Sequence, residues 1–282
     1  MKLVGIDYTL VSVLYLSIDC SCGVIVLVRK SYGTTKSNDP KETPCEQISG
    51  SDRIDEKGES FITERGVECT PESFPEFYRL FQKWGWMDFI KQPTEIEGEI
   101  IREFYANVSQ TPDAKVVKVR GRMVKFDKAT INTLYKLPTY AIDQYTTCLA
   151  DAIDMKDIVE FICLSGTVLP TTGNFLKASL TPVAKIWFAF IASRLMPTTH
   201  YTKISKDKAR LIYSLMKGHT VDIGELICKG FIRNATKEGA QTFWFPSLIF
   251  RLCIQVEVQM GEGVGDGNGP KVSKKRSGKQ KF

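Results

Sequence analysis

Between residues 71 and 258, apolar side chains recur mostly three or four positions apart, which is the spacing of one face of an α-helix. The first two sets are Phe74, Phe77, Phe81 and Trp84, and then Ile96, Ile100, Phe104 and Val108. Because Pro93 lies between them, the pattern predicts two consecutive amphipathic helices.

Later helices are marked by residue types that cap helix N-termini. The expected caps are Asp127, Asp154, Thr181, Ser205 and Asp222. They precede helices that we expect over residues 128–137, 155–164, 183–196, 206–217 and 223–237. Glu225 lies three residues after Asp222, as in a capping box, and Phe245-Pro246 opens a last expected helix over residues 247–256.

Within residues 115–126 the period changes from that of a helix to that of a strand. Valines alternate there with lysines and arginines, and Gly121 lies at the centre, which predicts a β-hairpin with one apolar face. The expected fold is therefore mainly α: a multi-helix globular domain with one inserted β-hairpin, flanked by disordered segments.

The pattern divides the chain into four parts. Residues 1–30 are an apolar segment interrupted by Asp19, and a signal or anchor, two short strands, or a stretch outside any folded domain all remain open. Residues 31–70 are polar and suggest a disordered linker. The helical domain occupies 71–258, and 259–282 form a glycine-rich tether and a basic tail.

Composition adds that the 282 residues, 43% of them hydrophobic, can build a sizeable core without metal or disulfide support. The net charge of +6 is located in the tail, because residues 271–282 carry six Lys and Arg and no acid. None of the eight cysteines forms a C-x-x-C pair, so a zinc ribbon is not expected. Reduced, buried thiols of an intracellular protein are expected at Cys148, Cys163, Cys228 and Cys253.

The chain has only two histidines, His200 and His219, and they flank the helix expected over residues 206–217. That helix would separate them by roughly 18–20 Å, too far for both to bind one metal ion. We therefore interpret them as residues at helix ends.

Candidate acids and sequence motifs give no catalytic centre. Asp143, Asp151, Asp154 and Asp157 lie in one acidic run, which suggests a solvated face with a helix cap. Phosphate-loop, zinc-protease and nucleophile-elbow motifs are absent from the sequence. We expect no enzyme activity, no cofactor and no metal.

Two basic features remain. On the hairpin, Lys118, Arg120, Arg122 and Lys125 are expected to project from the face opposite the valines, where they could contact phosphates. In the tail, the candidate contacts are Lys274, Lys275, Arg276 and Lys279, a composition typical of nuclear-import signals and nucleic-acid arms. The alternatives are an ordinary charged face and a solubilising terminus.

Several segments in a fixed order resemble the plant transposon protein domain. They are "WGWMDFI", "IIREFYANV", "VVKVRGRMVKFDKATINTLYKLP", "AKIWFAFIASRLMPTTHYTKISKDKARLIYSLMKGHTVDIGELI" and "FPSLIFRLC". The resemblance covers residues 72–258 and implies a plant protein associated with transposable or retrotransposable elements. It implies no particular catalytic residue.

The expected function is that of a non-catalytic, transposable-element-derived interaction domain that binds nucleic acid through the hairpin and tail, or other proteins. Two alternatives stay open: a degenerate or accessory component of a transposition enzyme, and an intracellular structural protein without a nucleic-acid role. An intracellular location is expected, with the nucleus open, and a membrane is not expected as a partner.

Overall fold

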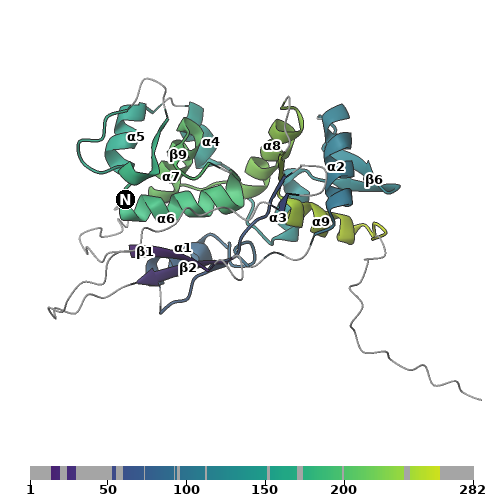
Figure 1. Cartoon of the computed structure of the whole chain (residues 1–282), viewed down its shortest axis with the longest axis horizontal. Coiled ribbons are helices and arrows are strands. Elements are labelled where there is room, and N and C mark those ends of the chain that lie inside the picture. The colour runs from purple at the N-terminus through teal and green to yellow at the C-terminus, as the bar shows by residue number, and fades with distance from the viewer. Residues whose placement is uncertain are drawn as a thin grey trace, which may run out of the picture.

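The computed structural model describes residues 14–19, 24–29, 53–54, 60–72, 74–91, 93, 96–111, 113–150, 153–169, 174–198, 200–237 and 242–260. These residues form nine α-helices and only short strands, so the expectation of a mainly α domain with an inserted hairpin is confirmed (Figure 1). The basic tail and the acidic residue Asp151 lie outside the described residues.

The helices follow the apolar periodicity closely. They are α1 (Pro75–Lys83), α2 (Gly98–Gln110), α3 (Lys128–Leu134), α4 (Gln144–Ala150), α5 (Met155–Ile162), α6 (Pro182–Phe190), α7 (Lys206–Met216), α8 (Ile223–Ala235) and α9 (Pro246–Gln255). A short π-helical stretch, Ile191–Leu195, continues α6. The sequence predicted every helix except α4 and did not predict the π-helical stretch.

All five expected caps are confirmed. The Asp127 carboxylate accepts a hydrogen bond from the Thr130 N–H at 2.8 Å, and the side chains at the other four positions accept equivalent bonds in the first turns of α5, α6, α7 and α8. The capping box at α8 is only half formed, because the Glu225 carboxylate pairs with Lys229 at 3.2 Å.

The helices form two groups that share one hydrophobic core. In Figure 1, α4, α5, α6 and α7 lie together at one end, and α2, α3, α8 and α9 lie at the other with the hairpin. Trp187 of α6 contacts Phe77 and Phe81 of α1, which joins α1 to the first group. In the second group, Phe104 of α2 and Phe231 of α8 meet edge to face.

The strands are short additions to this helical body. The hairpin consists of β6 (Val116–Val119) and β7 (Arg122–Lys125), and β8 (Phe175–Leu176) pairs with β9 (Lys203–Ile204). A second small sheet has the order β10 (Thr242–Trp244), β4 (Ser60–Ile62), β3 (Arg53–Ile54), in which β10 and β4 are parallel.

Residues 60–70, which we expected to lie in a linker, belong to the folded domain. Phe61, Val67 and Cys69 are buried in the core. The buried Glu64 carboxylate accepts hydrogen bonds from the Ser247 N–H at 3.0 Å and the Leu248 N–H at 2.9 Å, so it caps the N-terminus of α9. The linker expectation was wrong here because a few apolar residues and one acid are enough to bind this segment to the folded domain. Some of their partners, such as the N–H groups of α9, lie near the far end of the chain.

Part of the N-terminal segment is also described. β1 (Leu14–Asp19) and β2 (Val24–Arg29) form an antiparallel pair, and β2 also pairs in parallel with β5 (Val67–Glu68). Of the readings that the sequence left open, this is the pair of short strands. Every helix among the described residues is too short or too polar to cross a lipid bilayer.

Candidate functional site

The hairpin that carries the predicted basic residues closes through a two-residue turn, Arg120-Gly121. Both have positive φ, 44° and 83°, as a type I′ turn requires. The register pairs Val117 with Val124, and both are buried on the side that packs against α2. The local sequence therefore fixes both the turn and the apolar face.

The four basic residues of the hairpin do not share one face. Lys118 and Lys125 are exposed on the outer face, opposite the buried valines. Arg122 is in register with Val119 and so belongs to the inner face, at its exposed end, while Arg120 lies in the turn. The expectation that all four project opposite the valines was wrong, because a two-residue loop leaves Arg122 directly across from Val119.

Arg120 holds the turn against the helical body. Its guanidinium forms ion pairs with Glu97 and, at 3.6 Å, with Glu99, and donates to the Gln259 carbonyl at 2.6 Å. Its backbone N–H donates to the Glu103 carboxylate at 2.7 Å. Through these contacts Arg120 holds the hairpin to α2 and to the segment after α9. The outward-facing cations of the hairpin are therefore Lys118 and Lys125.

A cavity of about 480 Å³ lies among α4, α7 and α8. Its acidic lining residues are Asp143, Asp207, Asp222 and Glu225, and its basic ones are Lys208, Lys229, Arg233 and Lys237. Arg233 pairs with Asp207 at 3.2 Å, and Lys229 pairs with Glu225 at the same distance. The cavity is therefore electrically balanced and has no evident preference for a charged ligand.

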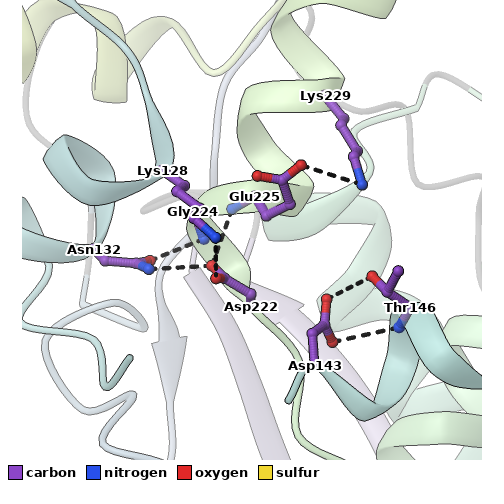
Figure 2. A network of polar contacts seen from close by, with 8 residues as sticks. All are labelled: Lys128, Asn132, Asp143, Thr146, Asp222, Gly224, Glu225 and Lys229. Atoms are coloured by element: carbon purple, nitrogen blue, oxygen red, sulfur yellow. Dashed lines mark hydrogen bonds and ion pairs between the residues drawn. The ribbon is translucent and has the colours of Figure 1, made fainter. Parts of the chain in front are cut away.

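A buried polar network joins α3 to the N-terminus of α8 (Figure 2), and its member Asp222 also lines this cavity. The Asn132 amide donates to Asp222 at 3.1 Å and accepts from the Gly224 N–H at 2.9 Å. The same Asp222 oxygen accepts from the Glu225 N–H at 3.0 Å, and Lys128 lies 3.8 Å from the other oxygen. Each member has a partner, so this network holds two helices together.

The acids that the sequence singled out have separate positions. The Asp143 carboxylate accepts from the Thr146 hydroxyl at 2.7 Å and caps α4, and Asp154 caps α5 (Figure 2 for Asp143). Asp157 is exposed in the first turn of α5. Within the described residues, no group of three or more histidines, cysteines, aspartates or glutamates is placed to hold a metal ion.

The two histidines lie beyond opposite ends of α7. His200 is exposed, whereas His219 is partly buried and its ring meets that of Tyr213 at a centroid distance of 6.4 Å. Burial lowers the pKa of His219, and the Lys217 charge lowers it further. The lowered pKa favours the neutral form of the His219 imidazole. His219 lies just after the end of α7, as the sequence predicted.

Buried thiols are found where we expected them at Cys163, Cys228 and Cys253, and also at Cys69, while the Cys148 side chain lies outside the described part of the chain. Burial raises the pKa of Cys69 and Cys163 to about 11 and that of Cys253 to about 12. Because the thiolate is the nucleophilic form, these residues act as core side chains.

The fold and these surfaces define a mainly helical domain with one inserted β-hairpin, in which polar side chains cap the N-termini of most helices. Residues 82–259 match a family described as "Putative plant retrotransposon-related domain", and the chain belongs to this family. It is therefore a transposable-element-derived protein, and the resemblance seen in the sequence is confirmed. No curated protein and no solved structure matches the chain significantly.

Proposed function

We propose that this transposable-element-derived protein is a non-catalytic, intracellular nucleic-acid-binding protein. Its phosphate contacts are Lys118 and Lys125 on the outer face of the hairpin, Arg122 at the hairpin end, and the basic tail. Contacts of this kind provide affinity without reading sequence, and their strength depends steeply on salt.

The observation that carries this proposal is the outer face of the hairpin. Lys118 and Lys125 are exposed there on neighbouring strands, and neither has an ion pair with another described residue. Arg122 is 57% exposed and lies 3.9 Å from Glu257, a distance that gives only a weak surface pair. Since Arg120 anchors the turn, the hairpin is a firm platform for these three cations.

The non-catalytic part of the proposal is supported by how the acids and thiols are used. Asp143, Asp154 and Asp222 cap helices, and the described thiols have raised pKa values. The tail residues Lys274, Lys275, Arg276 and Lys279 would add flexible phosphate contacts and suit a nuclear location.

The test is fluorescence anisotropy of labelled duplex DNA and single-stranded RNA with the full chain, at several salt concentrations. We expect the triple variant Lys118→Gln, Arg122→Gln, Lys125→Gln to weaken binding about tenfold. The slope of the logarithm of the binding constant against the logarithm of salt concentration should fall by the equivalent of about two to three phosphate contacts. Deletion of residues 271–282 should weaken binding further.

The matched control removes three exposed lysines elsewhere, Lys156, Lys203 and Lys206, by substitution with glutamine. It changes the net charge equally and should cost less than about threefold. Equal losses in both triple variants would show that the hairpin makes no special phosphate contact. Absence of salt-dependent binding would favour a protein without a nucleic-acid role. Metal-dependent strand cleavage that Asp154→Ala abolishes would contradict the non-catalytic assignment.

A further inference from the structure

A second cavity, of about 330 Å³, is lined by a marked excess of positive charge. Four cationic side chains reach it: Lys91, Lys136, Arg194 and Arg251. The single acid in its lining, Asp88, forms ion pairs with Lys91 and, at 3.3 Å, with Lys136. None of these residues belongs to the hairpin or to the electrically balanced cavity.

Arg194, on the π-helical stretch after α6, is the deepest of the four. Its residue is only 2% exposed, and its Nε has no hydrogen-bond partner. One guanidinium nitrogen donates to the Phe89 carbonyl, and the guanidinium lies 4.6 Å from the centroid of the Phe89 ring. A buried donor of this kind costs stability unless something binds it.

Arg251, from α9, is held in a similar way. Its guanidinium lies 4.7 Å from the centroid of the Tyr135 ring, and that ring meets Phe89 edge to face at 5.1 Å. Each arginine thus lies over one member of an aromatic pair, and this contact restricts its side chain and lowers the entropy lost when it binds a ligand.

No described acid neutralises the two arginines directly. Among the described residues neither Arg194 nor Arg251 forms an ion pair, and both oxygens of the nearby buried Glu64 accept hydrogen bonds from α9. Burial lowers the pKa of Arg194 and the Arg251 charge lowers it further, while the neighbouring Tyr135 and the Glu64 carboxylate oppose this. Asp88, the one acid in the lining of the cavity, pairs with the two lysines and not with the arginines.

We propose that this cavity is a binding site for a phosphate monoester, with Arg194 and Arg251 as the principal ligands and the two lysines at its rim. Guanidinium groups match the oxygens of phosphate with paired hydrogen bonds. A monoester carries about −1.5 to −2 near pH 7, which fits the excess of three positive charges better than a single carboxylate does. The volume is within the ordinary range for small ligands.

The experiment is isothermal titration calorimetry of the full chain with inorganic phosphate, AMP and adenosine at constant ionic strength. We expect saturable binding of phosphate and AMP and none of adenosine. Arg251→Met, which keeps an unbranched apolar stem that can still cover the Tyr135 ring but removes the guanidinium, should weaken binding at least about tenfold. Lys136→Gln, at an 82% exposed position, should weaken it by a smaller factor.

Arg102→Met is the matched control, because Arg102 also lies over an aromatic ring, 5.7 Å from the Phe61 centroid, but does not line the cavity. It should bind phosphate as the unmodified protein does, and so should the hairpin triple variant, which separates this proposal from nucleic-acid binding. AMP binding more tightly than phosphate would show that the site also recognises the nucleoside part, and equal affinities would show that it recognises the phosphate group alone. The proposal is overturned by absence of saturable binding, by equal binding of adenosine, or by unchanged affinity in Arg251→Met.

Discussion

Two buried polar clusters in this protein differ in whether their hydrogen-bonding groups are satisfied. At the N-terminus of α8, the Asn132 amide donates to Asp222 and accepts from the Gly224 N–H, and little space is left between α3 and α8. Around Arg194, a buried guanidinium keeps an unpartnered nitrogen beside an open cavity. The first cluster is complete in the isolated chain, and the second becomes complete only with an added anion.

The difference shows how buried polarity can be interpreted. A closed network stabilises one arrangement of helices, and breaking it exposes unpaired groups to a low-dielectric interior. An open cluster costs stability in the free protein, and ligand binding can recover that cost. Stability measurements therefore distinguish the two.

The largest effect is expected from Gly224→Ala. An added Cβ would lie 2.5 Å from the Asn132 side-chain oxygen and 2.5 Å from the Lys128 carbonyl, which belongs to the backbone and cannot move aside easily. We expect a loss of about 3 kcal/mol or more in the free energy of unfolding, measured by urea titration. Gly98→Ala, whose nearest contact is a Phe61 ring carbon at 3.3 Å, should cost less than about 1 kcal/mol. A tolerated Gly224→Ala would show that α3 and α8 are not tightly coupled.

A smaller effect is expected when one side chain is removed from each cluster. Asn132→Ala leaves the Gly224 N–H unpaired and should cost about 2–3 kcal/mol. Arg194→Met loses the contact with Phe89 but also removes an uncompensated buried charge, so its cost should be about 1 kcal/mol. Urea titrations without phosphate test this order. If Arg194→Met were the more harmful, the guanidinium would be a structural element of the core.

The smallest effect concerns Lys208, in the electrically balanced cavity. Burial lowers its pKa to about 8, the Arg233 charge contributes in the same direction, and Asp207 opposes it. Between pH 8 and the ordinary lysine value the unfolded chain binds more protons, so stability should rise with pH there. Because the side chain keeps part of its hydration, we expect a total below about 1 kcal/mol. Thermal unfolding of Lys208→Met should show no such rise, and an identical pH profile would exclude Lys208 as its source.

Local sequence determined much of the fold. The five caps, the proline-led starts of α6 and α9, and the hairpin were all predictable, because each depends on residues within one or two turns of chain. Helix α4 was missed, since its cap Asp143 lies in an acidic run that we interpreted mainly as a solvated face.

The features that were missed depend on residues far apart in the sequence. Glu64 caps a helix 183 residues later, and the cavity arginines come from different helical segments, so neither leaves a local pattern. The role of Arg120 was hidden for the same reason: its partners include Glu97, immediately before α2, and the Gln259 carbonyl. For the candidate site, the sequence located the hairpin cations but did not reveal which of them face outward.

The bond from Glu64 to α9 also constrains how the chain reaches its native state. β4 pairs with β10, and the α9 N-terminus takes its cap from the same early segment, so both contacts span most of the domain. Such long-range contacts slow folding, because a large loop must close before they contribute. During synthesis β4 lacks its β10 partner, and the Glu64 carboxylate lacks the N–H groups it binds, until α9 has left the ribosome. Intermediates without these contacts expose apolar surface, which favours aggregation and chaperone binding.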